Sequence, residues 1–350
     1  MDIMTLNEQI LELKKELGKS IVIPAHHYEN PEIVEVADFV GDSYKLAADC
    51  AKIDAEFIVF CGVYFMAEAA DLLSSSTQKV LMPDIEARCP MADQIGYQQA
   101  DKVFQKISGC TTRQIAPVVY MNSTAEIKSF SGKYGGSVCT SSNAGKIIKH
   151  FLDQDKVVFF APDYNLGNNT ANELGLKDKE IVKVTSDFQC VGGNPSQAKI
   201  FIWDGYCYVH KRFLVNDILD LRTKNPGIKI IVHPECDREV VINSDDSGST
   251  QKIYEEIKKS PTGSIWGVGT EFNFVQRIAW EFPDKTVLPL RKSICGNMAK
   301  ITPEKLLKIL QSVQSHLQKK TALEGIVQVS ESMKNNAARA LHKMIEIVEK

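Results

Sequence analysis

The chain has 350 residues, of which 44% are hydrophobic and 24% are charged, and its formal net charge is −3. This composition is ordinary for a globular protein and excludes a disordered, collagen-like or coiled-coil chain. The 41 basic and 44 acidic residues nearly balance, so the chain has no bulk field that would attract nucleic acid or an anionic membrane. We therefore expect neither as a partner.

Residues 1–20 predict an amphipathic helix and no export signal. Apolar positions such as Ile10 and Leu17 are separated by charged residues, whereas a signal peptide needs an uninterrupted apolar stretch. The longest apolar runs, 156–162 and 229–233, have the length of a strand and fall far short of a membrane span. The sequence therefore predicts a cytoplasmic protein without a membrane-spanning segment.

The cysteines are widely spaced, odd in number and contain no CxxC pair. In a reducing compartment this pattern indicates buried thiols or metal ligands and not a disulfide framework. The nine cysteines are Cys50, Cys61, Cys89, Cys110, Cys139, Cys190, Cys207, Cys236 and Cys295.

Short β-rich runs alternate with helical patterns, which is typical of βαβ units and a parallel sheet. The same plan of three strands occurs three times. The first strands are expected at 20–24, 116–120 and 228–233. The second strands are expected at 57–61, 157–161 and 264–268. The third strands are expected at 79–83, 199–203 and 286–290. We interpret this rhythm as one α/β unit used three times.

The predicted boundaries follow from this repeat. The first α/β domain spans 1–107 and includes the N-terminal helix, the second spans 108–213, and the third spans 214–300. Residues 301–350 are expected to form C-terminal helices, the first opened by Thr302 as N-cap and a proline after it. No low-complexity linker separates these segments.

Polar side chains follow the first strand of every repeat. Ligands bind beyond the carboxyl ends of parallel strands, so these side chains are candidates for a shared site. Imidazole, phenol and carboxylate groups commonly transfer protons, although such groups at strand ends are often simply hydrogen-bonded. The candidates are His26, Tyr28, Tyr120, Asn122, His233 and Glu235.

Small-residue turns open the helix that follows each cluster. Ser43, Ser141 and Thr250 lie at these predicted helix N-termini, where free N–H groups attract anions. Plain helix capping is the alternative role. Three such turns together indicate a substrate rich in carboxylate or phosphate, while no P-loop or GxGxxG motif suggests a nucleotide.

One cysteine follows each third strand: Cys89, Cys207 and Cys295. Three thiolates around an axis suit a [4Fe–4S] cluster in which one iron has no protein ligand. A catalytic zinc ion and ordinary buried thiols are the alternatives. His210, three residues after Cys207, is expected to support the metal without binding it.

With these residues assembled, the chain resembles the quinolinate synthase family, often called the A protein. The resemblance covers nearly the whole length, and its motifs occur in the family's order. The motifs include Pro24-Ala25-His26-His27-Tyr28, Gly41-Asp42-Ser43, Cys61-Gly62-Val63, Tyr120-Met121-Asn122, Thr140-Ser141-Ser142-Asn143, Pro162-Asp163, Gly205-Tyr206-Cys207, His233-Pro234-Glu235-Cys236, Gly248-Ser249-Thr250, Gly269-Thr270-Glu271 and Cys295-Gly296-Asn297-Met298.

The resemblance implies three similar α/β domains with parallel sheets about a pseudo-threefold axis. It also implies a [4Fe–4S] cluster held by Cys89, Cys207 and Cys295, whose unique iron acts as a Lewis acid. The implied reaction, part of NAD biosynthesis, condenses iminoaspartate with dihydroxyacetone phosphate to quinolinate and releases phosphate and two waters. An aspartate oxidase or dehydrogenase is the implied source of iminoaspartate.

The family's site residues carry over onto matching positions. The catalytic set would be Glu235 and Tyr28, an acid–base pair, with the substrate-binding histidines His26 and His233. Tyr120 would position the intermediate. The side chains implied for carboxylate and phosphate binding are Ser43, Asn122, Ser141, Ser249 and Thr250.

Other interpretations stay open on the sequence alone. The diphthamide synthase radical enzyme and the diphosphate reductase of isoprenoid synthesis share a three-cysteine cluster design but need different pocket motifs. A non-catalytic iron–sulfur sensor would be expected to carry a DNA-reading helix or basic patch, and we find neither. A zinc hydrolase on the same fold is separated from these by metal analysis.

Overall fold

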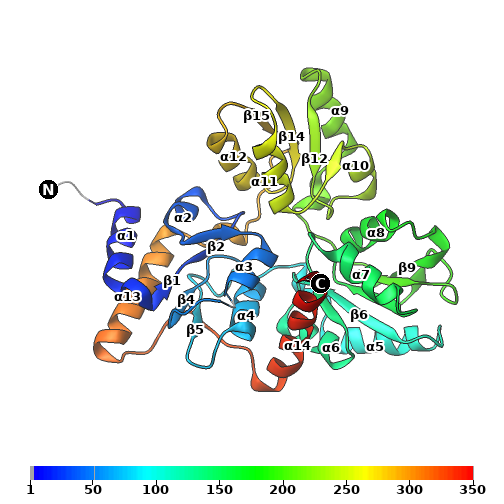
Figure 1. The fold of residues 1–350 in the computed structure, drawn as a ribbon, viewed down its shortest axis with the longest axis horizontal. Helices are drawn as coiled ribbons and strands as arrows, with labels where there is room; N and C mark the ends of the chain where they lie inside the picture. Colours follow the sequence, from blue (N-terminus) through cyan, green and yellow to red (C-terminus); the bar gives the residue numbers. More distant parts are fainter. Residues whose placement is uncertain (1–3, 51, 350) are drawn as a thin grey trace. The chain divides into compact units, whose positions relative to one another are not determined.

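The computed structural model describes residues 4–50 and 52–349, whose helices and strands are labelled in Figure 1. The chain divides into two compact units. The first comprises Met1–Cys89 and Ile294–Ser330, and the second comprises Pro90–Ser293 and Glu331–Lys350. The two C-terminal helices therefore belong to different units, and the division into three domains and a C-terminal segment remains a prediction.

Unit 1 is built on a four-stranded sheet of order β1-β4-β5-β16, beside which β2 pairs with β3 in parallel. The first three strands run parallel, and β16 is antiparallel to β5. The strands are β1 (Ile21–Val22), β2 (Pro24–His26), β3 (Phe39–Gly41), β4 (Phe57–Val59), β5 (Lys79–Leu81) and β16 (Ile326–Val327). The helices are α1 (Leu6–Leu17), α2 (Pro31–Val36), α3 (Ser43–Cys50), α4 (Tyr64–Leu73) and α13 (Pro303–Lys319), with short 3-10 turns η1 (Gly18–Ser20) and η5 (Met298–Lys300).

Capping threonines start two helices of unit 1, and the one at Thr302 is predicted from the sequence. Thr5 caps α1, accepting from the Glu8 N–H, while the Glu8 carboxylate accepts from the Thr5 N–H at 2.7 Å. The Thr302 side chain caps α13 by accepting from the Lys305 N–H, and Pro303 is the first residue of the helix. The predicted N-terminal helix and the first C-terminal helix are confirmed, and they pack against each other.

Unit 2 contains a six-stranded sheet of order β10-β9-β11-β8-β6-β7, parallel except for β10. Its strands are β6 (Ile115–Tyr120), β7 (Ser137–Cys139), β8 (Val157–Ala161), β9 (Ile181–Val184), β10 (Cys190–Val191) and β11 (Ile200–Trp203). Helices α5 (Tyr97–Ser108), α6 (Ala125–Lys133), α7 (Ala144–Leu152), α8 (Tyr164–Glu173) and α14 (Glu331–Glu349) accompany them, with 3-10 turns η2 (Ala92–Gln94), η3 (Asp178–Glu180) and η4 (His210–Arg212).

Unit 2 also contains a four-stranded parallel sheet of order β13-β12-β14-β15. Its strands are β12 (Lys229–Val232), β13 (Asp246–Ser247), β14 (Ile265–Gly269) and β15 (Thr286–Pro289). Its helices are α9 (Val215–Lys224), α10 (Arg238–Ile242), α11 (Thr250–Lys259) and α12 (Phe272–Glu281). A core that includes Phe213, Ile230 and Leu290 fills the space between this sheet and its helices.

The same strand plan recurs in all three larger sheets. The first, second and third strands of each predicted repeat are neighbours in that order: β1-β4-β5, β6-β8-β11 and β12-β14-β15. Each adjacent pair is parallel, so the carboxyl ends of the three strands lie at one edge. The α/β class and the repeated strand plan are confirmed, whereas the pseudo-threefold arrangement stays a prediction.

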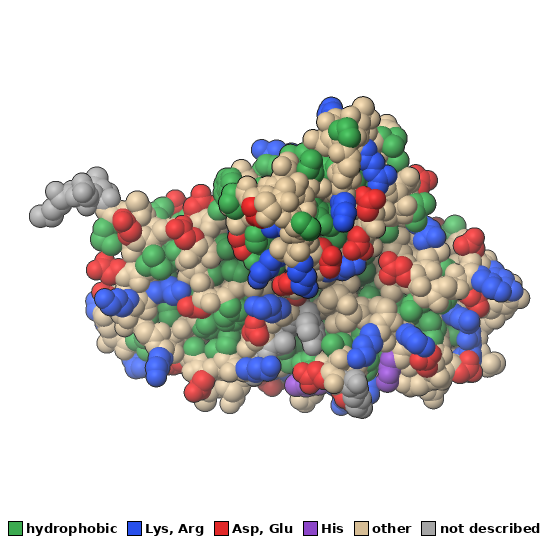
Figure 2. Space-filling view, turned by 45° about the horizontal axis from the view of Figure 1, so that its top comes forward, with side chains coloured by type: hydrophobic (Ala, Val, Ile, Leu, Met, Phe, Trp, Pro, Cys, Tyr) green, Lys and Arg blue, Asp and Glu red, His purple; other side chains and the backbone are tan. Residues whose placement is uncertain are grey.

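The surface agrees with the composition. Figure 2 shows Lys and Arg side chains interspersed with Asp and Glu over the face that it draws, as the small net charge leads one to expect. Within residues 4–50 and 52–349, no helix is long and apolar enough to cross a membrane.

Candidate active site

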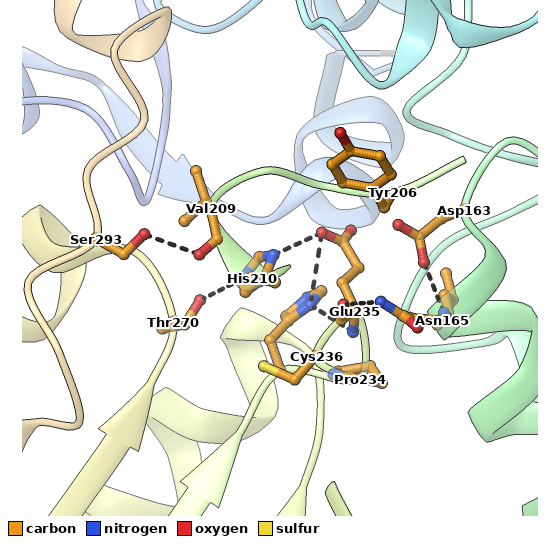
Figure 3. A network of polar contacts seen from close by, with 12 residues as sticks. Asp163, Asn165, Tyr206, Val209, His210, Pro234, Glu235, Cys236, Thr270 and Ser293 are labelled. Atoms are coloured by element: carbon orange, nitrogen blue, oxygen red, sulfur yellow. Dashed lines mark hydrogen bonds and ion pairs between the residues drawn. The ribbon is translucent and has the colours of Figure 1, made fainter. Parts of the chain in front are cut away.

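Four strand-end loops of unit 2 meet in a buried polar cluster. Tyr120 is the last residue of β6, and Glu235 lies in the loop between β12 and α10. His210 begins the short turn η4 after β11, and Thr270 directly follows β14. Figure 3 shows His210, Glu235 and Thr270 pointing toward one another from separate segments. The side chains come from both sheets of the unit, so the cluster depends on how these sheets pack.

Glu235 is at the centre of this cluster. Its side chain is 2% exposed, and its carboxylate accepts a hydrogen bond from His210 Nδ1 at 2.7 Å. The Tyr120 phenol donates a second hydrogen bond to the same carboxylate. His233 Nδ1 lies 3.9 Å away. A buried carboxylate is stable only with such partners, so the surrounding donors keep Glu235 ionised.

His210 links Glu235 to a hydroxyl group. Because the ionised carboxylate accepts from Nδ1, that nitrogen carries the proton and Nε2 is free to accept. Thr270 Oγ1 lies 3.0 Å from Nε2 and donates to it. The His233 ring stacks on the His210 ring, with centroids 4.4 Å apart and planes inclined by 17°. The result is a carboxylate–imidazole–hydroxyl relay, the arrangement that activates a hydroxyl group for proton transfer.

The protonation states follow from burial and charge. Burial alone would raise the pKa of Glu235, but the neighbouring His233 and His210, with hydrogen bonds from His210 and Tyr120, lower that pKa to about 2. Burial and the neighbouring His210 lower the pKa of His233 to about 3. At neutral pH the cluster therefore holds an ionised Glu235 beside a neutral His233.

A second carboxyl group lies close to Glu235. Asp163 is fully buried, and its Oδ1 accepts from the Leu166 N–H at 2.6 Å, which caps α8. Its Oδ2 has no hydrogen-bond partner among the residues that the structure describes. Burial and the negative charge of Glu235 raise the pKa of Asp163 well above its ordinary range. The two carboxyl groups are thus driven toward opposite protonation states.

Polar groups suited to anions surround the strand ends of unit 2. Ser141 lies in the turn before α7, and Ser249 caps α11, its Oγ accepting from the Lys252 N–H at 3.3 Å. Thr250 is the first residue of α11 and is buried. In the turn where the sequence offers Thr250 as a cap, the capping residue is therefore its neighbour Ser249. The Asn122 Oδ1 atom is buried without a hydrogen-bond partner in the described part of the chain, so a ligand donor would satisfy it.

The remaining predicted site residues belong to unit 1. His26 ends β2 and is 4% exposed, and its ring meets the Tyr28 ring edge-on at 4.6 Å. The Tyr28 N–H donates to His26 Nδ1 at 3.2 Å. Ser43 begins α3, while the neighbouring Asp42 accepts from the Lys45 N–H and caps the helix. These three residues thus lie around the strand and helix ends at which the sequence places them.

The cysteines differ in their fitness as metal ligands. Burial raises the pKa of the half-buried Cys190 and of four fully buried cysteines, among them Cys50 to about 12, so the four buried thiols keep their protons. The four are Cys50, Cys61, Cys139 and Cys236. Metals bind the thiolate, so these positions are poor ligands. None of the nine cysteines forms a disulfide within the residues described.

Cys89, Cys207 and Cys295 are the better candidates, because all three are only half-buried and each follows the third strand of its sheet. Three thiols are the donor set that a [4Fe–4S] cluster takes, so their chemistry suits the expected cluster, which stays a prediction. Cys207 also lies near His210 and Glu235, with one potential ligand atom of each within 4.8 Å of the others. Since His210 Nδ1 is hydrogen-bonded to Glu235, we assign that pair to the proton relay.

Sequence reasoning found only part of this cluster. Tyr120, His233 and Glu235 are predicted, and the structure brings them together. His210 is predicted only as a support for the metal, and Thr270 is not proposed at all, although it follows a second strand in a polar motif. Which strand-end loops face one another is decided by sheet packing, and no pattern within a single repeat carries that information.

Parallel α/β sheets with buried proton-transfer groups at the carboxyl ends of their strands define an α/β enzyme. Residues 8–346 match the family model described as quinolinate synthetase A protein. Curated relatives named quinolinate synthase include those of Bacillus subtilis (strain 168), 41% identical over 98% of this chain and 93% of the relative, and Listeria monocytogenes serotype 4b (strain F2365), 42% identical over 97% and 93%. A relative from Acidobacterium capsulatum is 39% identical over 98% and 93%.

The chain therefore belongs to the quinolinate synthetase A protein family, and it is an enzyme of this type.

Proposed function

We propose that this chain condenses iminoaspartate with dihydroxyacetone phosphate to quinolinate, releasing phosphate and two waters. Membership of the family supports the reaction, and the buried Glu235–His210–Thr270 relay is the observation in this molecule that carries it. Ring formation with two dehydrations requires repeated removal and return of protons at carbon, nitrogen and hydroxyl groups. A buried relay holds protons at defined atoms and excludes water, so it suits this series of proton transfers.

The same groups of the relay act first as a base and then as an acid. Thr270 Oγ1 takes a proton from the substrate while its own proton passes to His210 Nε2. The ionised Glu235 carboxylate stabilises the imidazolium that results. Return of the proton along the same path protonates a departing hydroxyl group as water. Tyr120, which donates to Glu235, holds the carboxylate in line with the imidazole.

Substrate binding uses groups suited to carboxylate and phosphate. Ser141 and Thr250 lie at the N-terminal ends of α7 and α11, where N–H groups and the helix dipole attract anions. The Asn122 amide is a proposed contact for a substrate carboxylate or phosphate through its Nδ2 donor, and its Oδ1 would accept from a substrate donor. The histidine and phenol of unit 1, His26 and Tyr28, are the proposed contacts for the remainder of the substrate.

Cys89, Cys207 and Cys295 would hold the [4Fe–4S] cluster. When bound, such a cluster supplies a Lewis acid toward a substrate hydroxyl or carboxylate oxygen. Iminoaspartate is an unstable imine, so we propose that an aspartate oxidase or dehydrogenase supplies it.

The test is quinolinate formation by anaerobically reconstituted protein and by its Glu235→Gln variant. We expect the variant to keep the visible absorbance of the cluster and lose turnover, because a neutral amide cannot stabilise the His210 imidazolium. A loss of about 10⁴-fold is the scale reported for the equivalent change in a hydrolase relay. Near-normal quinolinate production by Glu235→Gln would remove this residue from the mechanism. Absence of quinolinate from wild-type protein with a full cluster would overturn the proposed activity.

A further inference from the structure

The loop that carries Glu235 has three consecutive carbonyl groups whose partners lie on another element. Residues 234–236 connect β12 to α10 and are buried. Buried carbonyl groups need hydrogen-bond donors, and a tight loop cannot supply them from its own backbone. The donors come from the side chains of two asparagines on α8, a helix of the other sheet of unit 2.

Asn169 donates to two of these carbonyls. Its Nδ2 lies 2.9 Å from the Pro234 oxygen and 2.9 Å from the Cys236 oxygen, which flank Glu235 on both sides. Both amide hydrogens are therefore used. The side chain is 2% exposed, so water does not compete for these bonds. The reversed amide orientation would set oxygen against two carbonyl oxygens, so the loop itself dictates which way the amide points.

Asn165, one helical turn earlier on the same face of α8, holds the middle of the loop. Its Nδ2 donates to the Glu235 carbonyl at 3.1 Å and to Asp237 Oδ1 at 3.0 Å. Figure 3 shows the Asn165 amide directed at the backbone of Glu235. Asp237 is held further by Lys211, whose Nζ lies 2.7 Å from Oδ1.

Capping and close packing fix the position of α8, the helix that carries both asparagines. Asp163 caps its first turn. Gly167, which lies between the two asparagines in sequence, packs so closely that a Cβ atom there would meet Phe160 at 2.7 Å and Ile202 at 2.9 Å. These residues belong to β8 and β11, so the position of α8 is set by the central strands of the six-stranded sheet. A rigid sheet thus fixes the helix, and the helix fixes the loop.

We propose that Asn165 and Asn169 are positioning residues that hold Glu235 in register with His210 by clamping the carbonyl groups of residues 234–236. This inference rests on the proposed function, in which Glu235 acts through His210. The Glu235 side chain has to reach His210 at 2.7 Å, a distance that a small displacement of the loop would lengthen. Misplacement of a catalytic group by 1 Å can cost about 100-fold in rate. Neither asparagine is expected to contact the reacting atoms.

Loss of Asn165 and loss of Asn169 should disturb the loop to different degrees. Asn165 lines a polar cavity of about 350 Å³, together with Lys183, Lys211 and Arg238. Water in this cavity can replace the Asn165 donor, whereas the more deeply buried Asn169 has no such substitute. Asn169→Ala should therefore disturb the loop more than Asn165→Ala.

The first test follows the loop without reference to turnover. Amide hydrogen exchange should become faster in peptides covering 233–240 of Asn169→Ala, and less so in Asn165→Ala, while the strands of the six-stranded sheet stay protected. Asn172→Ala is the matched control, because this amide donates only to Asn168, on the same helix, among the residues described. Unchanged exchange of 233–240 in both clamp variants would overturn the proposal. Should Asn169→Ala fail to fold, Asn165→Ala provides the same comparison.

The second test asks whether the asparagines act through Glu235. In wild-type background we expect Asn169→Ala to lower kcat by about 10- to 100-fold with KM changed less than about threefold, and with unaltered cluster absorbance. In a Glu235→Gln background the same substitution should lower the residual kcat far less, because the group it positions is already gone. An equal loss in both backgrounds would contradict the proposal. Absence of turnover in wild-type protein would count against the proposed function alone, since the exchange test would still decide the clamp.

Discussion

His233 illustrates how burial sets the behaviour of one side chain. The sequence places this histidine at a strand end as a substrate-binding group, and the structure shows it 2% exposed, stacked on His210 and beside Glu235. A charged imidazole is disfavoured there, which keeps the ring neutral at neutral pH. The Glu235 N–H donates to His233 Nδ1 at 3.3 Å, so the neutral ring carries its proton on Nε2, which can donate to a substrate.

This burial predicts a stability that falls with acidification. Unfolded His233 binds a proton below a pH of about 6.5, whereas the buried ring stays neutral down to its pKa of about 3. The unfolded state therefore binds more protons in this window, and the contribution of His233, full above pH 6.5, declines by about 2 kcal/mol between pH 6.5 and 5. Urea unfolding at a series of pH values measures it. His233→Asn should flatten the pH dependence, and an equally steep dependence in that variant would show the interpretation to be wrong.

At the residue scale, the sequence predicts the chemistry of individual groups better than their partners. Glu235 and Tyr120 are both predicted from strand ends, yet their hydrogen bond joins two different sheets of unit 2. Asn165 stands in the polar run that follows a second strand, and Asn169 lies one helical turn later, but the sequence does not show which loop either amide faces. Only the packing of α8 against the loop after β12 reveals their role.

At the scale of elements, the close packing of α14 on α6 is a strong constraint. Gly132 lies in α6 where α14 crosses it, and a Cβ atom there would meet the Asn336 carbonyl oxygen at 1.8 Å and the Ala340 nitrogen at 3.3 Å. These atoms belong to helix backbone, which cannot rotate aside as a side chain can. Glycine at position 132 is therefore required for the two helices to approach.

Gly132→Ala should destabilise the protein by about 1–3 kcal/mol, because the added methyl group forces the helices apart. Gly145→Ala is the matched control: it also adds a methyl group within a helix of unit 2, but the nearest atom is Thr170 Cγ2 at an ordinary 3.8 Å. The control should be neutral or slightly stabilising, since alanine is the better helix former. Chemical denaturation of both variants measures the difference, and equal stability would contradict the predicted clash.

Element prediction succeeds where local signals are strong. The strands β8 and β11 and the capped helix α13 lie close to their predicted ranges, because apolar runs and N-cap residues mark them. The antiparallel β10 and β16 are two-residue strands without such a pattern, and β9 falls outside the three-strand plan. Pairing with an existing sheet edge creates β10 and β16, so local sequence could not predict them, whereas the β-branched run Ile181–Val184 of β9 carries a strand signal that the three-strand plan left out.

At the scale of the whole molecule, the metal content tests the proposed chemistry most directly. We expect about four irons and four sulfides per chain after anaerobic reconstitution. Cys207→Ala should lose the cluster and its visible absorbance while the α/β fold remains. Cys110→Ala, a half-buried cysteine outside the matched trio, should retain both. One zinc without sulfide would favour the hydrolase alternative, and an intact cluster in Cys207→Ala would remove this residue from the ligand set.

The repeated strand plan could be predicted from sequence, but its grouping into units could not. The two C-terminal helices follow each other directly in the chain, yet α13 belongs to unit 1 and α14 to unit 2. Both have amphipathic patterns, which indicate that one face of each helix is buried but not which surface covers that face. Gly132 of α6 lets α14 pack closely against this helix, but the sequence does not show which helix needs the glycine.

The placement of α14 has a consequence for biosynthesis. A ribosome makes Pro90–Ser293 first, then returns to unit 1 for Ile294–Ser330, and only afterwards makes the helix that covers α6 and β7. Unit 2 therefore emerges with an apolar surface uncovered while about forty further residues are translated, which takes roughly 2–8 seconds at ordinary rates of synthesis. During that interval chaperones can bind the exposed apolar surface. A chain that terminates before α14 would keep this surface exposed and would be prone to aggregate.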